Sequence, residues 1–421
     1  YPGMQKTNSY LTPFILITSL FFLWGFAHNL DPILIPHLKK SFTLTTTQST
    51  LVDSAVFIAY FFMALPAGYI MKKWGYKTGI ITGLLLFSLG SFLFVPAANY
   101  QSYDYFLVAL FVIACGLTIL ETAANPYVSA LGDPASATQR LNLAQSFNGL
   151  AVALAPAIGA RVILTKGQTD AELAAMTDAA RKIALATEAY SVKTPYTVLA
   201  IVLLLVAAVF YFVQLPDLRK NTKSNAGSLL KTFRHAHLTW AVAAQFFYVG
   251  AQVCVFSLFI LYATSSANLT DLQAADYLGI GGLAFLIGRF AGTAIMKFMP
   301  PHKLLMFYAI ISTILCGIAI TGHGMITIYA FIGICFFMSI MFPTIFSLGI
   351  KDLGSDTEMA SSLIVMSIVG GAIMPRIFGL ISDASGNIQL GYIVPLFCFS
   401  VVAFFGWKGY KIKTPPNFGG V

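Results

Sequence analysis

Apolar runs of about twenty residues recur along almost the whole chain, and this feature most restricts the possible fold. We count twelve runs, near residues 12–38, 48–71, 77–97, 103–131, 140–164, 195–215, 238–263, 271–297, 303–321, 325–349, 358–382 and 389–408. A run of this length crosses the hydrocarbon core of a bilayer as an α-helix. Inside that core the backbone must satisfy its own hydrogen bonds. The pattern therefore predicts an all-α membrane protein with twelve transmembrane helices.

The composition supports this class and excludes others. Hydrophobic residues make up 57% of the 421 residues and charged residues only 10%, against roughly 25% charged in a soluble domain. A transmembrane β-barrel would instead show alternating segments of about ten residues. The net charge of +9 is concentrated in loops, so we expect no nucleic-acid partner.

The positive side chains fall mainly on one side of the predicted membrane. Sixteen lysines and arginines lie at one set of loops and ends and six at the other, of which three or four belong to the longer 165–194 loop that also carries acids. The positive-inside rule then places both termini in the cytoplasm. We expect a multi-pass protein of the plasma membrane.

A basic linker divides the chain into two halves. Residues 216–237 are rich in lysine, serine and asparagine, and separate an N-terminal bundle of six helices (1–215) from a C-terminal bundle of six (238–421). The halves repeat each other, because Pro126 lies six residues before Gly132 and Pro343 lies six residues before Gly349. Parallel six-helix repeats with a site between them are typical of one class of secondary transporters.

An acid inside the fourth run marks the candidate functional site. Glu121 lies in the sequence FVIACGLTILETAANPYVSAL, and an ionised side chain at this depth costs several kcal/mol unless it is paired, hydrated or protonated. Asn125 and Pro126 follow it, and the proline removes the donor to the carbonyl of Thr122. Packing against a neighbouring helix is the alternative role. We interpret Glu121 as a coupling and sugar-binding residue.

Two further acids suggest a cation site. Asp31 and Asp53 lie at similar depths in the first and second runs, and Pro32 frees the carbonyl of His28 beside Asn29. Carboxylate, amide and carbonyl oxygens are ligands that a hard cation such as Na⁺ accepts. We therefore expect Na⁺ at Asp31 and Asp53, bordered by His28. The alternative is that both acids are solvated at helix ends.

Amides and aromatic rings complete the predicted sugar site. Gln145 and Asn148 are three residues apart and share a helix face. We expect them to bind sugar together with Asn29 of the first run. The second half contributes Tyr248, Gln252 and Phe342, whose rings and amide suit a pyranose. Hydrogen bonding between helices is the alternative role for the amides.

These motifs resemble those of the fucose:proton symporter family of the major facilitator superfamily. The most specific are Leu120-Glu-Thr-Ala-Ala-Asn-Pro126 and Arg140-Leu-Asn-Leu-Ala-Gln145, and Pro343-Thr-Ile-Phe-Ser-Leu-Gly349 supports them. The resemblance covers nearly the whole chain. It implies cation-coupled uptake of a hexose by rocking of two halves, with Glu121 matching the coupling glutamate and Gln145 and Asn148 the sugar-contacting amides.

Three departures from the family pattern change the expected ion and sugar. Pro32 stands where the fucose carriers have an acid, Asp53 stands in place of an amide, and Phe342 stands in place of a tyrosine. We therefore expect symport of a glucose-, galactose- or mannose-like hexose with Na⁺. The alternative is proton-coupled symport of L-fucose or a related sugar.

Other classes of function find less support. We find no nucleophile, phosphate-loop or HExxH motif, so we expect no enzyme. The five cysteines all lie in apolar runs, and we expect neither a cofactor nor a metal site at them. A channel or a sugar receptor is a more distant alternative. We expect the protein to work as a monomer in the bacterial inner membrane.

Overall fold

The fold is described from a computed structural model of the chain. It describes residues 11–30, 38, 41–43, 51–159, 174–216, 234–269 and 271–412. In this part of the chain every regular element is a helix. The prediction of an all-α membrane protein is confirmed.

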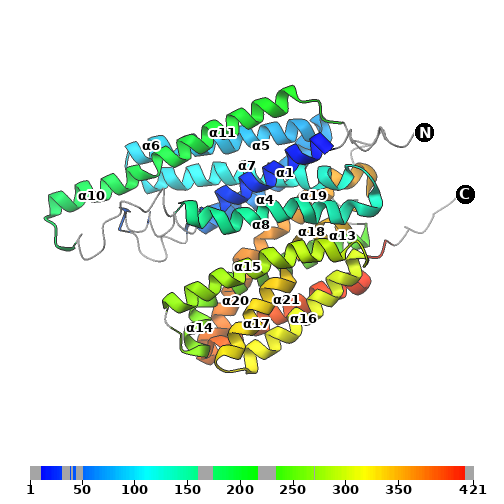
Figure 1. The fold of residues 1–421 in the computed structure, drawn as a ribbon. Helices are drawn as coiled ribbons and strands as arrows, with labels where there is room; N and C mark the ends of the chain where they lie inside the picture. Colours follow the sequence, from blue (N-terminus) through cyan, green and yellow to red (C-terminus); the bar gives the residue numbers. More distant parts are fainter. Residues whose placement is uncertain are drawn as a thin grey trace, which may run out of the picture.

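The helices before residue 216 pack into one bundle, drawn from blue to green in Figure 1. They are α1 (Leu11–His28), α4 (Leu51–Trp74), α5 (Tyr76–Phe92), α6 (Phe94–Asn99), α7 (Tyr103–Ala130), α8 (Ala137–Gly159), α10 (Asp178–Ser191) and α11 (Lys193–Phe212). Helices α5 and α7 approach closely at glycines: a Cβ on Gly116 would lie 2.5 Å from the Phe87 nitrogen. Small residues allow such contacts in membranes, where no hydrophobic force drives helices together.

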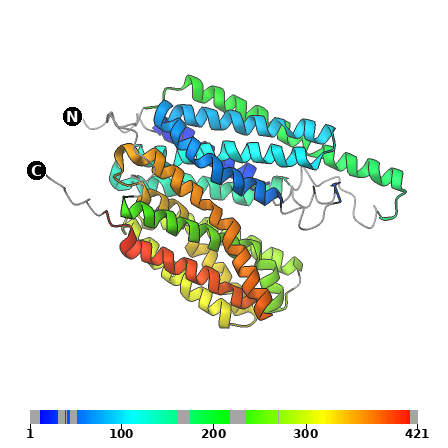
Figure 2. The same ribbon diagram turned by 180° about the vertical axis from the view of Figure 1, so that it is seen from behind.

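The helices after residue 234 form a second bundle, drawn from green to red in Figures 1 and 2. They are α13 (Ala236–Ser257), α14 (Phe259–Ala267), α15 (Asp271–Ile295), α16 (Pro301–Thr321), α17 (Met325–Met338), α18 (Met341–Gly349), α19 (Thr357–Met366), α20 (Gly370–Ser385) and α21 (Ile393–Phe404), which continues into the π-helical turn η6 (Phe405–Gly409). The linker residues 217–233 lie outside the described residues, so the domain boundary stays a prediction.

Eleven stretches of the described chain are long and apolar enough to cross a membrane. The expected fifth span is present as α8, a helix of 23 residues. It falls short of the others in hydropathy because its first half carries Arg140, Asn142, Gln145 and Asn148. These polar residues indicate that α8 faces protein more than lipid.

Four expected spans are interrupted within the described residues, which the continuous apolar pattern does not predict. The third breaks at Leu93, between α5 and α6. The tenth breaks at Ser339 and Ile340, between α17 and α18. The eleventh passes through a 3₁₀ turn at Ser367–Val369, and the seventh breaks at Leu258. Apolar residues continue across each break, so hydropathy alone conceals it.

The predicted 165–194 loop is wrong in its second part. Residues Asp178–Ser191 form α10, whose first turn is capped by the Thr177 hydroxyl accepting from the Ala180 nitrogen at 3.4 Å. This helix leads almost directly into α11, so it extends the sixth span beyond the other helices (Figure 1).

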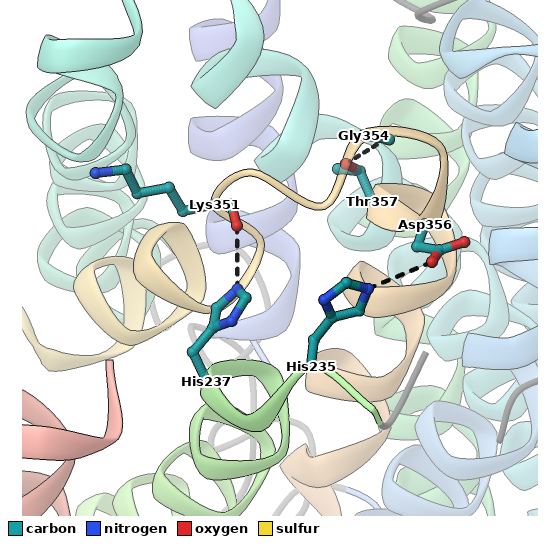
Figure 3. Close-up of polar contacts among 6 residues, drawn as sticks. All are labelled: His235, His237, Lys351, Gly354, Asp356 and Thr357. Carbon is teal, nitrogen blue, oxygen red and sulfur yellow. Dashed lines mark hydrogen bonds and ion pairs between the residues drawn. The ribbon is translucent and has the colours of Figure 1, made fainter. Parts of the chain in front are cut away.

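Two histidines hold the turn between α18 and α19 against the start of α13 (Figure 3). A ring nitrogen of His237 bonds the Lys351 carbonyl at 3.0 Å. The His235 ring lies 3.6 Å from a carboxylate oxygen of Asp356. The second bundle is therefore tied together at the end where α13 begins and α18 ends.

Candidate functional site

Glu121 lies in the middle of α7 and is only 9% exposed. Its carboxyl group is hydrogen-bonded by the side chain of Tyr60, from α4. Tyr60 is itself buried. A phenol can donate to a carboxylate or accept from a carboxylic acid. This pair can therefore hold the acid in either protonation state.

A chain of amides connects α7 to α8 beside this acid. The Asn125 amide donates to the backbone carbonyl of Glu121 at 2.9 Å. The Gln145 amide donates to the Asn125 side-chain oxygen at 3.0 Å. Gln145 is 4% exposed. Asn125 therefore links the Gln145 side chain to the backbone of Glu121. That these residues form one sugar site stays a prediction.

Asn148 and Asn29 meet at the backbone of α1. The Asn29 amide donates to the Gly25 carbonyl at 2.6 Å. A Cβ on Gly25 would lie 2.7 Å from the Asn148 amide nitrogen. Only glycine allows α8 to come this close, so Gly25 positions both amides. This glycine was not among the predicted site residues.

The expected sodium ligands are only partly described. Asp31 and Pro32 lie outside the described residues, so the structure does not test whether the His28 carbonyl is free. Asp53 lies in the first turn of α4, but its side chain is not described. The ring of His28 lines a cavity of about 10 Å³ inside the first bundle. The sodium site therefore stays a prediction.

The predicted residues of the second half have different environments. Tyr248 is fully buried, and its hydroxyl has no hydrogen-bond partner among the described residues. Both side-chain polar atoms of Gln245, three residues earlier on α13, also have none. Gln252 and Phe342 are partly exposed, and the Phe342 ring stacks with Phe346 at 6.4 Å. Buried polar groups require partners, so Gln245 joins the candidate site.

The two repeat-related prolines free carbonyls that bond to other helices. Pro126 leaves the Thr122 carbonyl without a helical donor, and the Ser361 hydroxyl of α19 donates to it at 2.6 Å. Pro343 does the same for Ser339, whose carbonyl accepts from Nε of Arg289 at 2.7 Å. The expected freed carbonyl of Thr122 is therefore present and in use.

Arg289 is a candidate site residue that the sequence pattern does not predict. It lies in α15 and is 4% exposed, and its Nη1 donates to the backbone carbonyl of Gln145 at 2.9 Å. The guanidinium also lies 4.6 Å from the centre of the Phe285 ring. A buried cation held by carbonyl dipoles and a ring thus joins the second half directly to the amide chain.

Five hydrogen bonds among the described residues join the halves, and they lie toward the end of the bundles where α8 and α19 begin and α18 ends. We call this end the terminus side, because α1 begins and η6 ends there (Figures 1 and 2). The inter-half bonds are Ser361 to Thr122, Arg289 to Gln145, Thr138 to Ser347 at 2.9 Å, Asn142 to Thr344 at 3.2 Å, and Gln139 to Thr293 at 3.4 Å. A Cβ on Gly68 would also collide with the Ser362 hydroxyl. The halves are therefore closed together on the terminus side.

Comparisons with known proteins agree with this geometry. The chain matches the Major Facilitator Superfamily over residues 14–354. The L-fucose-proton symporter of Escherichia coli (strain K12) is 44% identical over 421 residues, covering 98% of this chain and 96% of the relative. The glucose/galactose transporter of Brucella abortus is 40% identical over 401 residues, covering 94% and 93%.

Solved structures show the same similarity. A crystal structure of the transporter FucP in the outward conformation matches with a TM-score of 0.89 and 43% identity, covering 95% of this chain and 99% of that one. The proton:xylose symporter XylE matches with a TM-score of 0.72 at 14% identity, covering 96% of each chain. The second similarity concerns the fold alone.

Proposed function

Because the chain belongs to the Major Facilitator Superfamily and to its fucose:proton symporter family, we propose that it is a proton-coupled symporter of a hexose or deoxyhexose. The observation that carries the proposal is the position of Glu121. A buried acid, bonded to Tyr60, stands beside the amide chain that reaches Gln145. An acid within reach of sugar hydroxyls can exchange a proton and bind substrate in one place.

The proton is preferred to sodium as the coupling ion. Relatives at 44% and 34% identity are named as proton symporters. The sodium hypothesis rested on Asp31, Pro32 and Asp53, whose side chains are not described. The comparisons therefore do not support the sequence-based preference for Na⁺, and the proton alternative replaces it.

The sugar is a six-carbon aldose or its deoxy form. The relatives are named for L-fucose and for glucose or galactose, which makes these three sugars the first to test. On this chain the amides of Gln145 and Asn148 supply hydrogen bonds from the first half. Tyr248, Gln252 and Phe342 supply ring surface and an amide from the second half. Hydroxyl groups and the apolar face of a pyranose need both kinds of contact.

Transport by alternating access follows from the inter-half bonds. With the terminus side closed, substrate and proton reach the site from the opposite side. Release requires these bonds to break, so that the halves part on the terminus side and close on the other. The bias of lysines and arginines favours a cytoplasmic terminus side, and in this proposal the cycle therefore imports sugar. The protein works as a monomer in this proposal, because both halves come from one chain.

Uptake by proteoliposomes tests the proposal. We expect labelled L-fucose, D-glucose or D-galactose to accumulate when the inside is alkaline, without Na⁺. Accumulation with a sodium gradient at equal pH on both sides would contradict proton coupling and return sodium to the site. Preloaded vesicles should also exchange labelled for unlabelled sugar. A channel would only equilibrate the label and a receptor would move none.

A further inference from the structure

A groove with basic and aromatic walls opens on the outside of the second bundle, away from the sugar site. It lies between the start of α16 and η6, has a volume of about 360 Å³, and is lined by apolar, aromatic and basic side chains. Those the argument uses are Met306, Phe307, Trp407, His302, Lys303 and Lys411. Figures 1 and 2 show the red end of the chain beside the start of α16.

The backbone shapes this groove. A Cβ on Gly406 would lie 2.8 Å from the Met306 nitrogen and 3.0 Å from the His302 carbonyl oxygen, so the chain there runs directly against α16. The π-helical turn Phe405–Gly409 ends the twelfth span at this contact. The rings of His302 and Tyr410 stack at 4.2 Å. π-Helical turns inside helices are often found at functional sites.

The charge of the groove is entirely positive. The charged groups that act on His302 are Lys303, Lys351 and Lys411, and no acidic side chain lines the groove. Among the described residues, neither the Lys303 nor the Lys411 side chain makes a hydrogen bond or an ion pair. Like charges held close together repel each other and favour an anion between them.

At the corresponding place in the first half, the equivalent lysine is held by hydrogen bonds. There Lys77, at the start of the third helix α5, donates to the carbonyls of Tyr211 and Val213 at 2.8 and 2.9 Å. These carbonyls end the sixth helix, α11. In the second half, Lys303 lies at the start of α16, the third span of that half, and beside η6, where the sixth span ends. Its side chain has no such partner among the described residues. Both halves therefore have a lysine at this position, but Lys77 is hydrogen-bonded whereas the Lys303 side chain can bind a ligand.

We propose that this groove binds an anionic phospholipid from the leaflet on the terminus side. Its phosphate lies between Lys303 and Lys411, and an acyl chain lies along Phe307 and Trp407, each 54% exposed. The groove is at the level where membrane-spanning helices begin and end, which is where headgroups lie and aromatic side chains gather. Basic pockets between helices at this level suit acidic headgroups.

Native mass spectrometry of the purified full chain tests this site. Phosphatidylglycerol and phosphatidylcholine with identical acyl chains serve as probes. We expect one phosphatidylglycerol to be retained in preference to phosphatidylcholine. Lys303→Gln and Lys411→Gln should each weaken this preference by about fivefold. Both lysines lie at the groove's edge, and their removal breaks no contact of the described fold.

Two controls make the result decisive. Lys73→Gln removes a lysine that lies 4.8 Å from the Trp74 ring at the same end of the first bundle, and it should leave retention unchanged. Lys303→Arg with Lys411→Arg should keep the preference. Equal retention of both lipids, or retention unaffected by the glutamine variants, would overturn the proposal. Displacement of phosphatidylglycerol by millimolar inorganic phosphate would assign the site to a small anion instead.

Discussion

At the residue scale, the amides of Gln145 and Asn148 in α8 differ in how many hydrogen bonds an alanine substitution removes. Gln145 already donates to Asn125, so Gln145→Ala removes that bond together with any bond to sugar. Asn148 is partly exposed beside Gly25. We expect Asn148→Ala to weaken sugar binding by roughly three- to tenfold, the effect of one lost hydrogen bond of about 0.5–1.5 kcal/mol. Calorimetric titration of each variant with the transported sugar measures this.

A matched control separates sugar contacts from structural ones. Gln139, on the same helix, makes only a 3.4 Å bond to the Thr293 carbonyl, so Gln139→Ala should bind sugar like the parent. Parent-like affinity in Asn148→Ala would remove Asn148 from the site.

Glu121 carries a second prediction at this scale. Glu121→Gln keeps the size of the side chain and its position next to Tyr60, but it cannot exchange a proton. We expect this variant to exchange sugar across the membrane while losing accumulation driven by a pH gradient. Uptake and exchange in the same vesicles measure the two separately. Tyr60→Phe should have a smaller effect, because it removes one partner and not the acid. Steep accumulation by Glu121→Gln would assign coupling to another residue.

The sequence predicts the residues of the site that belong to recognisable motifs, and it misses a residue whose partners are backbone groups of other helices. Glu121, Asn125 and Gln145 stand in recognisable motifs, and hydrogen bonds join the Gln145 side chain through Asn125 to the Glu121 backbone. The pattern does not single out Arg289, whose partners are the carbonyls of Ser339 and Gln145. Backbone carbonyls from another helix leave no mark in the local sequence, so only the folded structure reveals their use.

At the element scale, the helix interruptions decide where the halves meet. Pro343 frees the Ser339 carbonyl at the break between α17 and α18, and Arg289 fills this position while bonding α8. In α7 the sequence predicts the effect of Pro126, which frees the Thr122 carbonyl. It does not predict the break at Ser339 or the 3₁₀ turn at Ser367–Val369, since apolar residues continue through both.

The inter-half bonds at these elements differ in strength, which gives a third prediction. Arg289→Met removes two charge-assisted bonds, each worth about 1.5–3 kcal/mol, whereas Ser361→Ala removes one neutral bond of about 0.5–1.5 kcal/mol. We expect both to loosen the closure on the terminus side, Arg289→Met more strongly. Maleimide labelling of a cysteine at Ser347, which is 5% exposed, reports the opening. Labelling no faster in Arg289→Met than in Ser361→Ala would show that Arg289 does not hold the closure.

At the scale of the whole molecule, the repeat and the charge distribution predict the architecture well. Apolar length predicts the spans, and the lysine bias predicts which loops share a side. The sequence does not predict on which side of the membrane the two halves are closed together. The closure rests on single hydrogen bonds between the halves, such as that between Thr138 and Ser347, and neither the repeat nor the charge pattern predicts them.

The closure of the halves on the terminus side gives the last prediction, which tests alternating access itself. The hydroxyl oxygens of Thr138 and Ser347 lie 2.9 Å apart, so cysteines at both positions should bring their sulfurs near disulfide distance. We expect the Thr138→Cys and Ser347→Cys pair, once oxidised, to hold the terminus side closed. Sugar should then still bind from the opposite side with affinity near that of the parent, but neither uptake nor exchange should occur. Reduction should restore both. The five native cysteines are buried, and each single-cysteine variant under the same oxidant is the matched control. Continued exchange by the oxidised pair would mean that sugar crosses without the halves parting at this contact, and the rocking cycle would have to be abandoned for this protein.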